Sequence, residues 1–182
     1  MSGEVSKLTV PHDHSRHIAN IHSGTPEHFQ HAIQACLTTH ASWANTPLEN
    51  RAANFLKAAD LLANKYRMQM NAVTMIGQSK TIFQAEMDAV CELVDFWRFN
   101  SAFAKNLMVE QPYSPQGQKN YLECRGLEGF VFAIGPFNFS SISLNLATAP
   151  ALMGCTVFWK PAKTALLASY LGLKILEEAG LP

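Results

Sequence analysis

The sequence predicts an α/β fold in which N-terminal helices precede a strand–helix–strand–helix unit of a parallel sheet. Two short apolar runs, FVFAI at 130–134 and CTVFW at 155–159, are each stopped by a turn signal that contains proline. Runs of this length, rich in aromatic and β-branched residues, are typical of fully buried strands. Between them, the Ala- and Leu-rich stretch 140–153 is long enough for a helix, and 164–179 predicts another. This alternation is the βαβ unit of a parallel sheet.

Capping residues mark the ends of these two helices. Gly154 is expected to end the first helix, because glycine adopts the left-handed conformation that closes a helix. Thr164 is expected to be the N-cap of the second helix, and Gly180 its stop before Pro182.

Residues 1–24 are polar and interrupted by proline and glycine, which predicts an extended arm with little core of its own. Thr25 and Pro26 then open a helix as its N-cap and first helical residue. Trp43 is expected in the connection to the next helix. Apolar residues at spacings of three and four place one face of the first helix toward a core. They are Phe29, Ile33, Cys36 and Leu37.

Three more helical stretches are expected before residue 110. The first starts at Pro47 and runs through 49–66, the second covers 68–76 and ends at Gly77, and the third covers 81–107. A surface loop at 110–120 and an extended stretch at 119–124 follow. The expected buried stripes are Ala52, Phe55, Ala59 and Leu62 in the first helix, and Phe83, Met87, Val90, Leu93, Val94, Trp97, Phe99 and Phe103 in the third.

Composition argues against several classes of function. Fourteen Lys and Arg balance fourteen Asp and Glu, so the chain has no excess charge to attract nucleic acid. A hydrophobic content of 48% is globular, and no apolar run reaches the roughly 18 residues that span a bilayer. The four cysteines form no CxxC pair, which favours reduced thiols. The first residues lack both a signal-peptide core and an Arg-rich presequence, so we expect no targeting signal.

Four polar residues near the N terminus allow two interpretations. His12, Asp13, His14 and His17 are residue types that ligate metals. No further ligands cluster near them in the sequence, so we expect a surface turn with solvated histidines and no metal site.

In parallel sheets, chemistry sits beyond the carboxyl ends of the strands. The segment PFNF at 136–139 follows the first predicted strand, and Lys160 follows the second. An amide and a cation at these places suit an oxyanion donor and a nucleotide contact. Alternatively, Asn138 caps the next helix and Lys160 is a solvated strand end, which spacing alone favours. Glu92 is likewise expected, on the residues alone, to lie on a solvated face, paired with Arg98.

Seven stretches together resemble the aldehyde dehydrogenase superfamily, and within it the delta-1-pyrroline-5-carboxylate dehydrogenases. The similarity extends from about Val10 to Pro182. The stretches are PHDH at 11–14, RAANFLKAADLL at 51–62, the run from GQSK to WRFN at 77–100, RGLEGF at 125–130, IGPFNF at 134–139, NLATAPALMGCTVFWKP at 145–161 and EEAGLP at 177–182.

The resemblance implies a truncated aldehyde dehydrogenase fold with three parts. These are an N-terminal arm and helical region at 1–117, the start of an oligomerisation strand at 118–128, and the first βαβα units of a Rossmann-like NAD-binding domain at 129–182. It also implies NAD as cofactor, a small aldehyde as substrate, a homo-oligomer at full length and, in a eukaryote, the mitochondrial matrix. The implied reaction oxidises L-glutamate γ-semialdehyde to L-glutamate in proline breakdown.

Several positions match the family's functional residues. Asn138 matches the side-chain donor to the oxyanion, and an amide can donate without adding charge. Lys160 matches the lysine that binds the ribose hydroxyls of NAD. Gly135, Pro136 and Phe137 match the backbone path that passes the cofactor.

Two matches concern the substrate, and one departure concerns the cofactor. Phe139 matches an aromatic residue that packs on the aliphatic part of the semialdehyde, and Glu92 matches a glutamate that lines the substrate tunnel. Ala162 and Lys163 stand where relatives carry a hydroxyl residue and an acid. Without the acid, repulsion of a 2′-phosphate is lost, so the choice between NAD and NADP stays open.

Other departures bear on activity. Ser143 and Leu144 replace small glycines, which is expected to alter helix packing. The family's nucleophilic cysteine and general-base glutamate lie beyond the position that matches Pro182, and Cys155 is expected to be inert in a buried strand. The chain alone is therefore expected to be inactive. An alternative is a non-catalytic truncated product that binds or competes with a full-length subunit.

Overall fold

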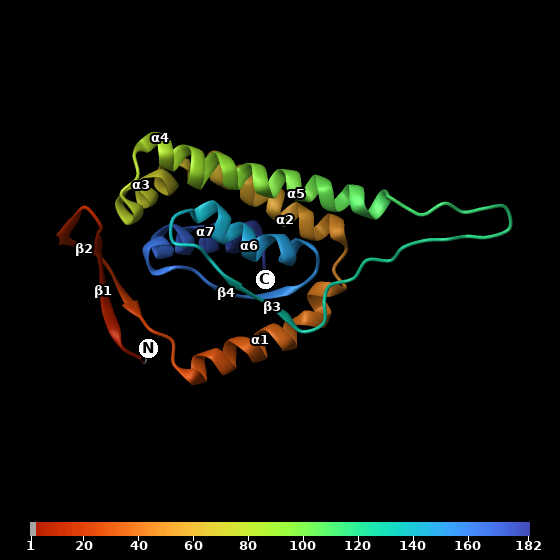
Figure 1. Cartoon of the computed structure of the whole chain (residues 1–182), viewed down its shortest axis with the longest axis horizontal. Helices are drawn as coiled ribbons and strands as arrows, with labels where there is room; N and C mark the ends of the chain where they lie inside the picture. Colours follow the sequence, from red (N-terminus) through yellow and green to blue (C-terminus); the bar gives the residue numbers. More distant parts are fainter. Residues whose placement is uncertain (1–2) are drawn as a thin grey trace.

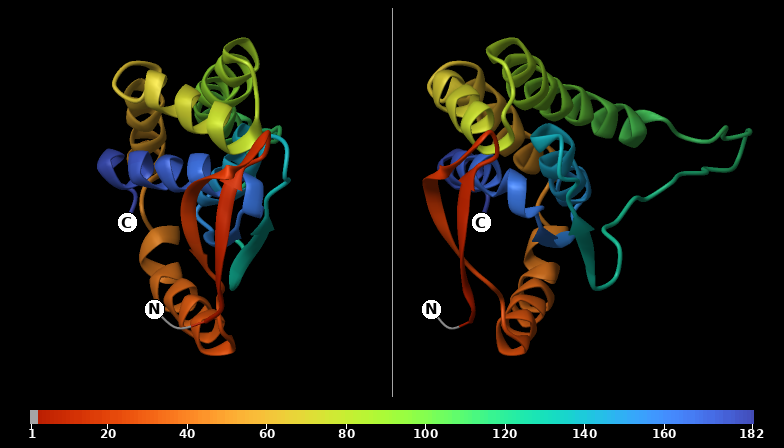
Figure 2. Two further views of the ribbon diagram at one scale, coloured as in Figure 1. Left: turned by 90° about the vertical axis from the view of Figure 1, so that its left-hand side faces the viewer. Right: turned by 60° about the vertical axis from the view of Figure 1, so that its left-hand side comes forward.

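The computed structural model describes residues 3–182, which begin with a β-hairpin. Strand β1 (Val5–Val10) pairs antiparallel with β2 (Asp13–His22), with a bulge near Thr9. The expected arm is therefore regular, and Leu8 and Val10 are buried, so the expectation of little core was wrong for this strand. The burial comes from contact between β1 and helix α3 (Arg67–Gln78), beside which the hairpin stands in Figure 2.

Helices α1 (Pro26–Ala44), α2 (Leu48–Ala63) and α3 follow. Thr25 is the N-cap of α1, as predicted, and shares a capping box with His28. Trp43 lies inside α1 and is buried, so its placement in a connection was wrong. Gly77 does not end α3 either. The helix continues to Gln78, and Ser79 closes it with a left-handed φ of 53°.

The longest helical stretch is continuous but not uniform. It comprises α4 (Ile82–Ala85), the π-helical turn η1 (Glu86–Cys91) and α5 (Glu92–Val109). The predicted stripe is buried at Val90, Leu93, Val94 and Trp97. A constant helical period could not anticipate the π turn, whose extra residue rotates the residues before it out of the stripe. Phe83 and Met87, which lie before or within this turn, are exposed instead. Phe99 and Phe103 are exposed for another reason, because they follow Trp97 by two and six residues in the regular helix α5 and so lie on another face.

The remaining elements form the predicted strand–helix–strand–helix unit. Strand β3 (Phe130–Ile134) pairs in parallel with β4 (Thr156–Lys160), in register from Phe130↔Thr156 to Ile134↔Lys160. Helix α6 (Ser140–Leu152) connects them, and α7 (Leu166–Ala179) follows β4. Gly154 and Gly180 have positive φ values at the ends of these helices, as predicted. Thr164 is not an N-cap, because it lies in the short 3₁₀ turn η2 (Lys163–Ala165).

The strands are not fully buried, contrary to prediction. Phe132 is 50% exposed and Ile134 is 58% exposed. In residues 3–182 this sheet has two strands, so each strand has one unpaired edge and its outer side chains lack neighbours.

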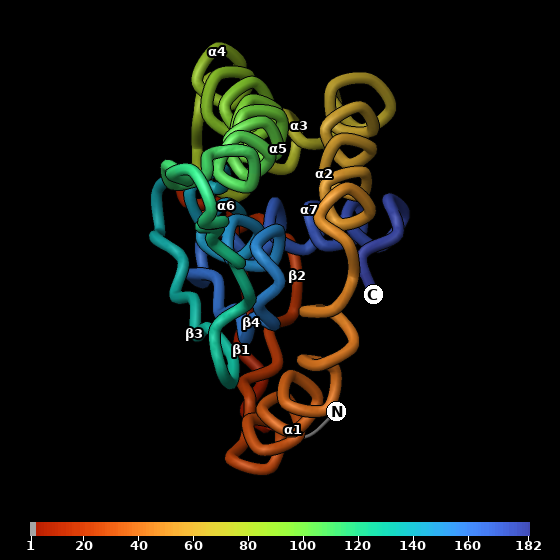
Figure 3. The backbone as a smooth tube through the Cα atoms, turned by 90° about the vertical axis from the view of Figure 1, so that its right-hand side faces the viewer, coloured from red at the N-terminus to blue at the C-terminus, as the bar shows by residue number. Residues whose placement is uncertain are grey.

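The elements stack in layers (Figures 1 and 3). Helix α1 contacts one side of the β3–β4 sheet, α6 and α7 lie on the other side, and α2 and α5 cover them. The core forms where α2, α5, α6 and α7 meet. Its largest members are Phe55, Leu62, Met70, Leu93, Trp97, Leu144, Leu152 and Ile175.

Residues 110–129 form a long loop without helix or strand, as the sequence predicts for 110–120. The loop projects far from the layers in Figure 1. The oligomerisation strand expected at 118–128 stays a prediction. None of the helices among residues 3–182 is long and apolar enough to cross a bilayer.

Candidate functional site

The turn after β3 and the end of β4 meet at one edge of the sheet. The N–H of Gly135 donates to the carbonyl oxygen of Lys160 at 3.0 Å. A Cβ atom at position 135 would lie 1.9 Å from Oγ of Ser143, so only glycine fits between β3 and α6. The candidate residues Gly135, Pro136, Phe137, Asn138, Phe139 and Lys160 therefore gather at this edge.

Asn138 is exposed, and its side chain does not cap α6. The N-cap position belongs to Phe139, which makes no side-chain capping bond. The capping interpretation of Asn138 was therefore wrong. Within residues 3–182 the Asn138 amide has no hydrogen-bond partner, while its backbone carbonyl accepts from Lys80 Nζ at 2.5 Å. The amide is thus held out to solvent on an anchored backbone.

The rest of the turn is also anchored. The carbonyl oxygen of Phe137 accepts from Gln78 Nε2 at 3.0 Å and from Thr164 Oγ1 at 2.8 Å. Ser140 Oγ donates to Gln78 Oε1 at 3.1 Å. Gln78 at the end of α3 and Thr164 after β4 thus hold the turn from two sides.

A buried polar network lies beneath the turn. Lys80 forms an ion pair with Asp88, whose side chain is 4% exposed, and Lys80 Nζ lies 4.4 Å from the Phe139 ring centroid. Ser141 Oγ lies 3.0 Å from Asp88 Oδ1 and also contacts Glu92 Oε2. Glu92 is therefore half-buried and directed toward the start of α6.

Arg98 is not the partner of Glu92. Its guanidinium pairs with Asp60 at 2.8 Å. The expectation of a solvated pair between Glu92 and Arg98 was wrong because the two residues lie six apart on α5 and face different sides, Glu92 toward Ser141 of α6 and Arg98 toward Asp60 of α2. Glu92 lines a groove of about 700 Å³, with walls that include Met87, Phe99 and Asn145.

A second groove, of about 550 Å³, lies beside Lys160. Phe29, Trp159 and Lys163 also line it, together with residues of β1 and β2. Lys160 is exposed at the carboxyl end of β4. Two lysines and aromatic walls offer cations for hydroxyl or phosphate oxygens and flat surfaces for a ring. These residues suit a nucleotide.

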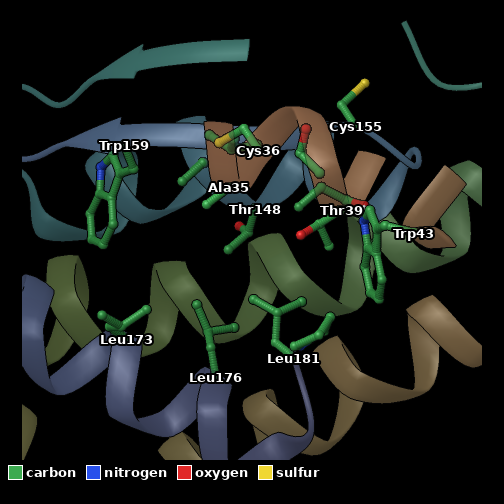
Figure 4. Close-up of a pocket in the computed structure, with 15 residues that line it drawn as sticks. Ala35, Cys36, Thr39, Trp43, Thr148, Cys155, Trp159, Leu173, Leu176 and Leu181 are labelled. Atoms are coloured by element: carbon green, nitrogen blue, oxygen red, sulfur yellow. Dashed lines mark hydrogen bonds between the residues drawn. The ribbon is translucent and has the colours of Figure 1, made fainter. Parts of the chain in front are cut away.

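The four cysteines are all free thiols. Cys36 and Cys155 line an apolar cavity of about 290 Å³ between α1, α6, β4 and α7 (Figure 4). Burial raises the pKa of the Cys36 thiol. Burial and the nearby Glu86 carboxylate raise the pKa of the Cys91 thiol. Raised pKa values keep both thiols protonated at neutral pH, so neither is suited to be a nucleophile.

The N-terminal polar residues are engaged with the hairpin and its surroundings. Asp13 pairs with Arg16 at 2.9 Å, and His12 Nδ1 lies 2.7 Å from Ser79 Oγ. His17 Nε2 lies 3.0 Å from Asn20 Oδ1. The described part of the chain contains no group of three or more His, Cys, Asp or Glu residues that could hold a metal ion.

Sequence reasoning missed the residues beneath the turn. Gln78, Lys80, Asp88 and Ser141 lie far from 135–139 in the sequence or on predicted helices, where polar side chains are normally solvated. No spacing in the sequence pointed to them, because the contacts that bring them to the turn form between segments far apart in the chain.

The site joins an exposed amide, a cation and a nucleotide-sized groove at the carboxyl edge of a parallel βαβ unit, as in nucleotide-dependent α/β enzymes. The sequence pattern of the Aldehyde dehydrogenase family matches residues 2–182, and the chain belongs to this family.

Individual relatives show which members of the family this chain is similar to. The chain is 46% identical over 182 residues to the delta-1-pyrroline-5-carboxylate dehydrogenase of Agaricus bisporus and 50% identical over 181 residues to the mitochondrial one of Mus musculus. It covers 33% and 32% of those proteins and is itself covered completely. The Mycobacterium tuberculosis delta-pyrroline-5-carboxylate dehydrogenase bound with NAD superposes with a TM-score of 0.98 at 50% identity, over all of this chain and 34% of that one.

The resemblance read from the sequence is thus confirmed, as is the α/β fold of the aldehyde dehydrogenase type. The chain spans about a third of the length of the curated relatives that it matches.

Proposed function

We propose that this chain is part of an enzyme that oxidises L-glutamate γ-semialdehyde to L-glutamate with NAD, as in proline breakdown. The observation that carries the proposal is the Asn138 amide, which is exposed on a turn whose backbone is fixed by Lys80, Gln78 and Thr164. The names of the relatives supply the substrate class, and the NAD-bound relative supports the cofactor.

Asn138 acts on the aldehyde oxygen. When a nucleophile adds to the carbonyl carbon, that oxygen gains negative charge and needs hydrogen-bond donors at its final position. The Asn138 NH₂ group donates without a net charge, so it favours the charged transition state over the neutral substrate.

The cofactor is held by Lys160 and by the backbone at Gly135, Pro136 and Phe137. Lys160 donates to ribose hydroxyls, and the absence of a Cβ at Gly135 keeps β3 close to α6 at the cofactor's path. NAD, when bound, accepts the hydride that the aldehyde carbon loses. Lys163 at the groove also tolerates a 2′-phosphate, so NADP is a second cofactor to measure.

The substrate chain lies along the groove at Glu92, with Phe139 packed on its methylene groups. Both residues border the same turn through Ser141 and Lys80. The aldehyde is a small polar molecule. We also propose that the complete protein forms a homo-oligomer. A mitochondrial location is proposed because several relatives are named mitochondrial.

Residues 1–182 do not supply the nucleophile in this proposal. Cys36 is half-buried and has a raised pKa, Cys155 is buried, Cys91 has a raised pKa, and Cys124 lies on the projecting loop. The isolated chain is therefore expected to show no turnover, and activity belongs to the complete gene product.

The test replaces Asn138 by Ala in the complete gene product. We expect kcat to fall roughly 10²–10³-fold, the usual cost of one oxyanion donor, with NAD affinity unchanged. Asn106→Ala, at an exposed asparagine on α5, is the matched control. Full kcat in Asn138→Ala, measured by NADH absorbance, would refute the role.

A second candidate function is a non-catalytic chain that binds or competes with a full-length subunit. The specific observation is the unpaired edges of the β3–β4 sheet together with the exposed loop, where Tyr113, Tyr121 and Leu122 are solvent-facing. The mass of the native product discriminates. A product of about 55–60 kDa, well above one ordinary domain, supports the enzyme, whereas one of 20.1 kDa that co-elutes with a full-length homologue supports the second function.

A further inference from the structure

The segment that joins α3 to α4 passes directly beneath the turn that carries Asn138. Gln78 bonds the carbonyl of Phe137, and two residues later Lys80 bonds the carbonyl of Asn138 at 2.5 Å. We propose that Lys80 is a positioning residue, which fixes the peptide group between Asn138 and Phe139 and thereby aims the Asn138 amide. The inference rests on the proposed function and extends it to a residue that never touches the substrate.

The surroundings of Lys80 determine its geometry. Its side chain is 15% exposed, and its ammonium group meets the Asp88 carboxylate, the Asn138 carbonyl and the face of the Phe139 ring, 4.4 Å from the centroid. An ammonium group has three N–H donors and no acceptor. Two of these contacts are charge-assisted, and the third is a cation–π contact.

The peptide group that Lys80 holds lies between the two side chains of greatest interest. Rotation of this group would swing the Cα–Cβ bond of Asn138 and the ring of Phe139 together. A displacement of about 1 Å at a reacting group is enough to lower a rate 100-fold. One ammonium group therefore sets the position of a proposed oxyanion donor and of a proposed substrate contact at once.

The ion pair with Asp88 helps to hold the Lys80 ammonium group in this position. Asp88 in the π turn η1 and Glu92 at the start of α5 are four residues apart, a spacing that puts neighbours on one helix face, and both contact Ser141. Lys80 neutralises Asp88 on one side, and Ser141 at the start of α6 contacts it on the other. The network joins η1, the α3–α4 segment and α6 around the turn.

The competing explanation is a buried ion pair that serves stability alone. Removal of Lys80 alone would leave the buried Asp88 carboxylate without an opposite charge and would destabilise the fold. The informative variant is therefore Lys80→Met combined with Asp88→Asn, which removes the pair without an orphaned charge. Lys174→Met is the matched control. Lys174 also pairs with a carboxylate, Glu177, and lies over an aromatic ring, but on the solvent-exposed face of α7.

The experiment uses the complete gene product, with L-glutamate γ-semialdehyde and NAD. In the double variant we expect kcat to fall about 100-fold, the Kd of NAD to change less than twofold, and amide hydrogen exchange to accelerate in the peptide that covers 136–142. A general loss of folding would weaken NAD binding as well, so the split between kcat and Kd separates the two explanations. Lys174→Met should match the wild type in all three measurements.

A kcat within threefold of the wild type in the double variant overturns the inference, provided that Asn138→Ala is inactive. If Asn138→Ala keeps full activity, the proposed function has failed. Hydrogen exchange in the double variant then tests the positioning role by itself, because unaltered exchange at 136–142 overturns that role. If the double variant does not fold, Lys80→Gln with Asp88→Asn replaces it. That pair stays hydrogen-bonded, but the shorter glutamine cannot also reach the Asn138 carbonyl, so an unchanged kcat again overturns the inference.

Discussion

At the scale of single residues, the structure depends on a few polar side chains that act between helices. Arg51 is one of them. Its guanidinium is buried at the junction of α1, α2 and α6, where Nε donates to the Leu152 carbonyl at 2.8 Å and Nη1 contacts the carbonyls of Ala44 and Thr46. Burial lowers the pKa of Arg51, although an arginine stays charged at any physiological pH. A planar fork of donors satisfies carbonyls that the helix ends leave unpaired.

Glu86 is a second such residue. Its carboxylate pairs with Arg67, accepts from Asn71 Nδ2 at 2.5 Å and lies 3.5 Å from Cys91 Sγ. Burial pushes the pKa of Glu86 upward, but the hydrogen bonds from Asn71, Arg67 and Cys91 together outweigh it and hold the pKa below its ordinary value. Because the folded pKa is depressed, ionised Glu86 stabilises the fold above its ordinary pKa, and this contribution is lost as the pH falls through the folded pKa.

We predict that Glu86→Gln lowers the free energy of unfolding by roughly 1–2 kcal/mol at pH 7, because hydrogen bonds to a charged acceptor are lost. The difference from the wild type should shrink from pH 5 toward pH 3, since the wild-type carboxylate becomes protonated there. Thermal unfolding of the purified chain at several pH values measures this. Glu177→Gln, at an exposed pair on α7, is the control with little effect. A difference that stays constant with pH would contradict the prediction.

At the scale of elements, the closest packing lies between β3 and α6. Gly135 leaves no space for a Cβ because Ser143 Oγ occupies it, and that hydroxyl has no hydrogen-bond partner among residues 3–182. If position 143 were glycine, the nearest remaining atom would be its Cα, at 3.4 Å. The expected effect of Ser143 on helix packing would arise at this contact, and it stays a prediction.

We predict that Gly135→Ala costs about 1–3 kcal/mol, the usual range for overpacking, and that Ser143→Gly relieves most of this cost. The single change Ser143→Gly should itself cost only about 0.5 kcal/mol of helix propensity. Urea unfolding of the four proteins gives the coupling energy directly. Gly77→Ala is the control, because its Cβ would sit 3.6 Å from the Thr164 carbonyl in ordinary contact. Additive effects of the two changes would show that the clash is not the cause.

The helices and strands also show which structural features can be predicted from the sequence alone. Local signals located the βαβα unit, the N-cap at Thr25 and the helix stops at Gly154 and Gly180, because each depends on neighbouring residues. They failed at the π turn, where a constant period placed Phe83 and Met87 in the core. They also failed at Leu8 and Val10, whose burial depends on α3, about 60 residues away.

The candidate site likewise contains residues that could be predicted from the sequence and residues that could not. The positions of Asn138 and Lys160 follow from strand ends, and the resemblance supplied their roles. Lys80, Asp88 and Ser141 were not found, because their relation to the turn is a long-range packing outcome that no spacing in the sequence encodes. The roles of Gly135, Pro136, Phe137, Asn138, Phe139, Lys160 and Glu92 stay predictions.

At the scale of the whole molecule, the regions 1–117 and 129–182 share one core despite the long loop between them. Trp97 Nε1 donates to Thr148 Oγ1 at 3.0 Å, and Trp43 Nε1 donates to the Ala151 carbonyl at 2.8 Å. Leu144 and Ile175 join Phe55 and Leu93 in the same cluster. The two regions are therefore not independently packed bodies within this chain, and the functional division at 118–128 stays a prediction.

We predict that limited digestion with trypsin first cuts the projecting loop, at Lys119 or Arg125, because both are exposed on backbone without helix or strand. The fragments 1–119 and 120–182 should then elute together in native size-exclusion chromatography, held by the shared core. A variant with Lys119→Gln and Arg125→Gln should resist this cleavage. Separation of the fragments without denaturant would contradict the shared core.

The shared core also sets an order of events during synthesis. Helices α2 and α5 are complete once residue 109 has left the ribosome, but Trp97 and Leu93 pack against side chains that arrive only with α6 and α7, which ends at Ala179. At about 5–20 residues per second, this delay lasts several seconds. During that interval the nascent chain presents an unpaired apolar face, so crosslinking to a ribosome-associated chaperone should be strong on ribosomes stalled near residue 150 and should weaken once α7 has emerged.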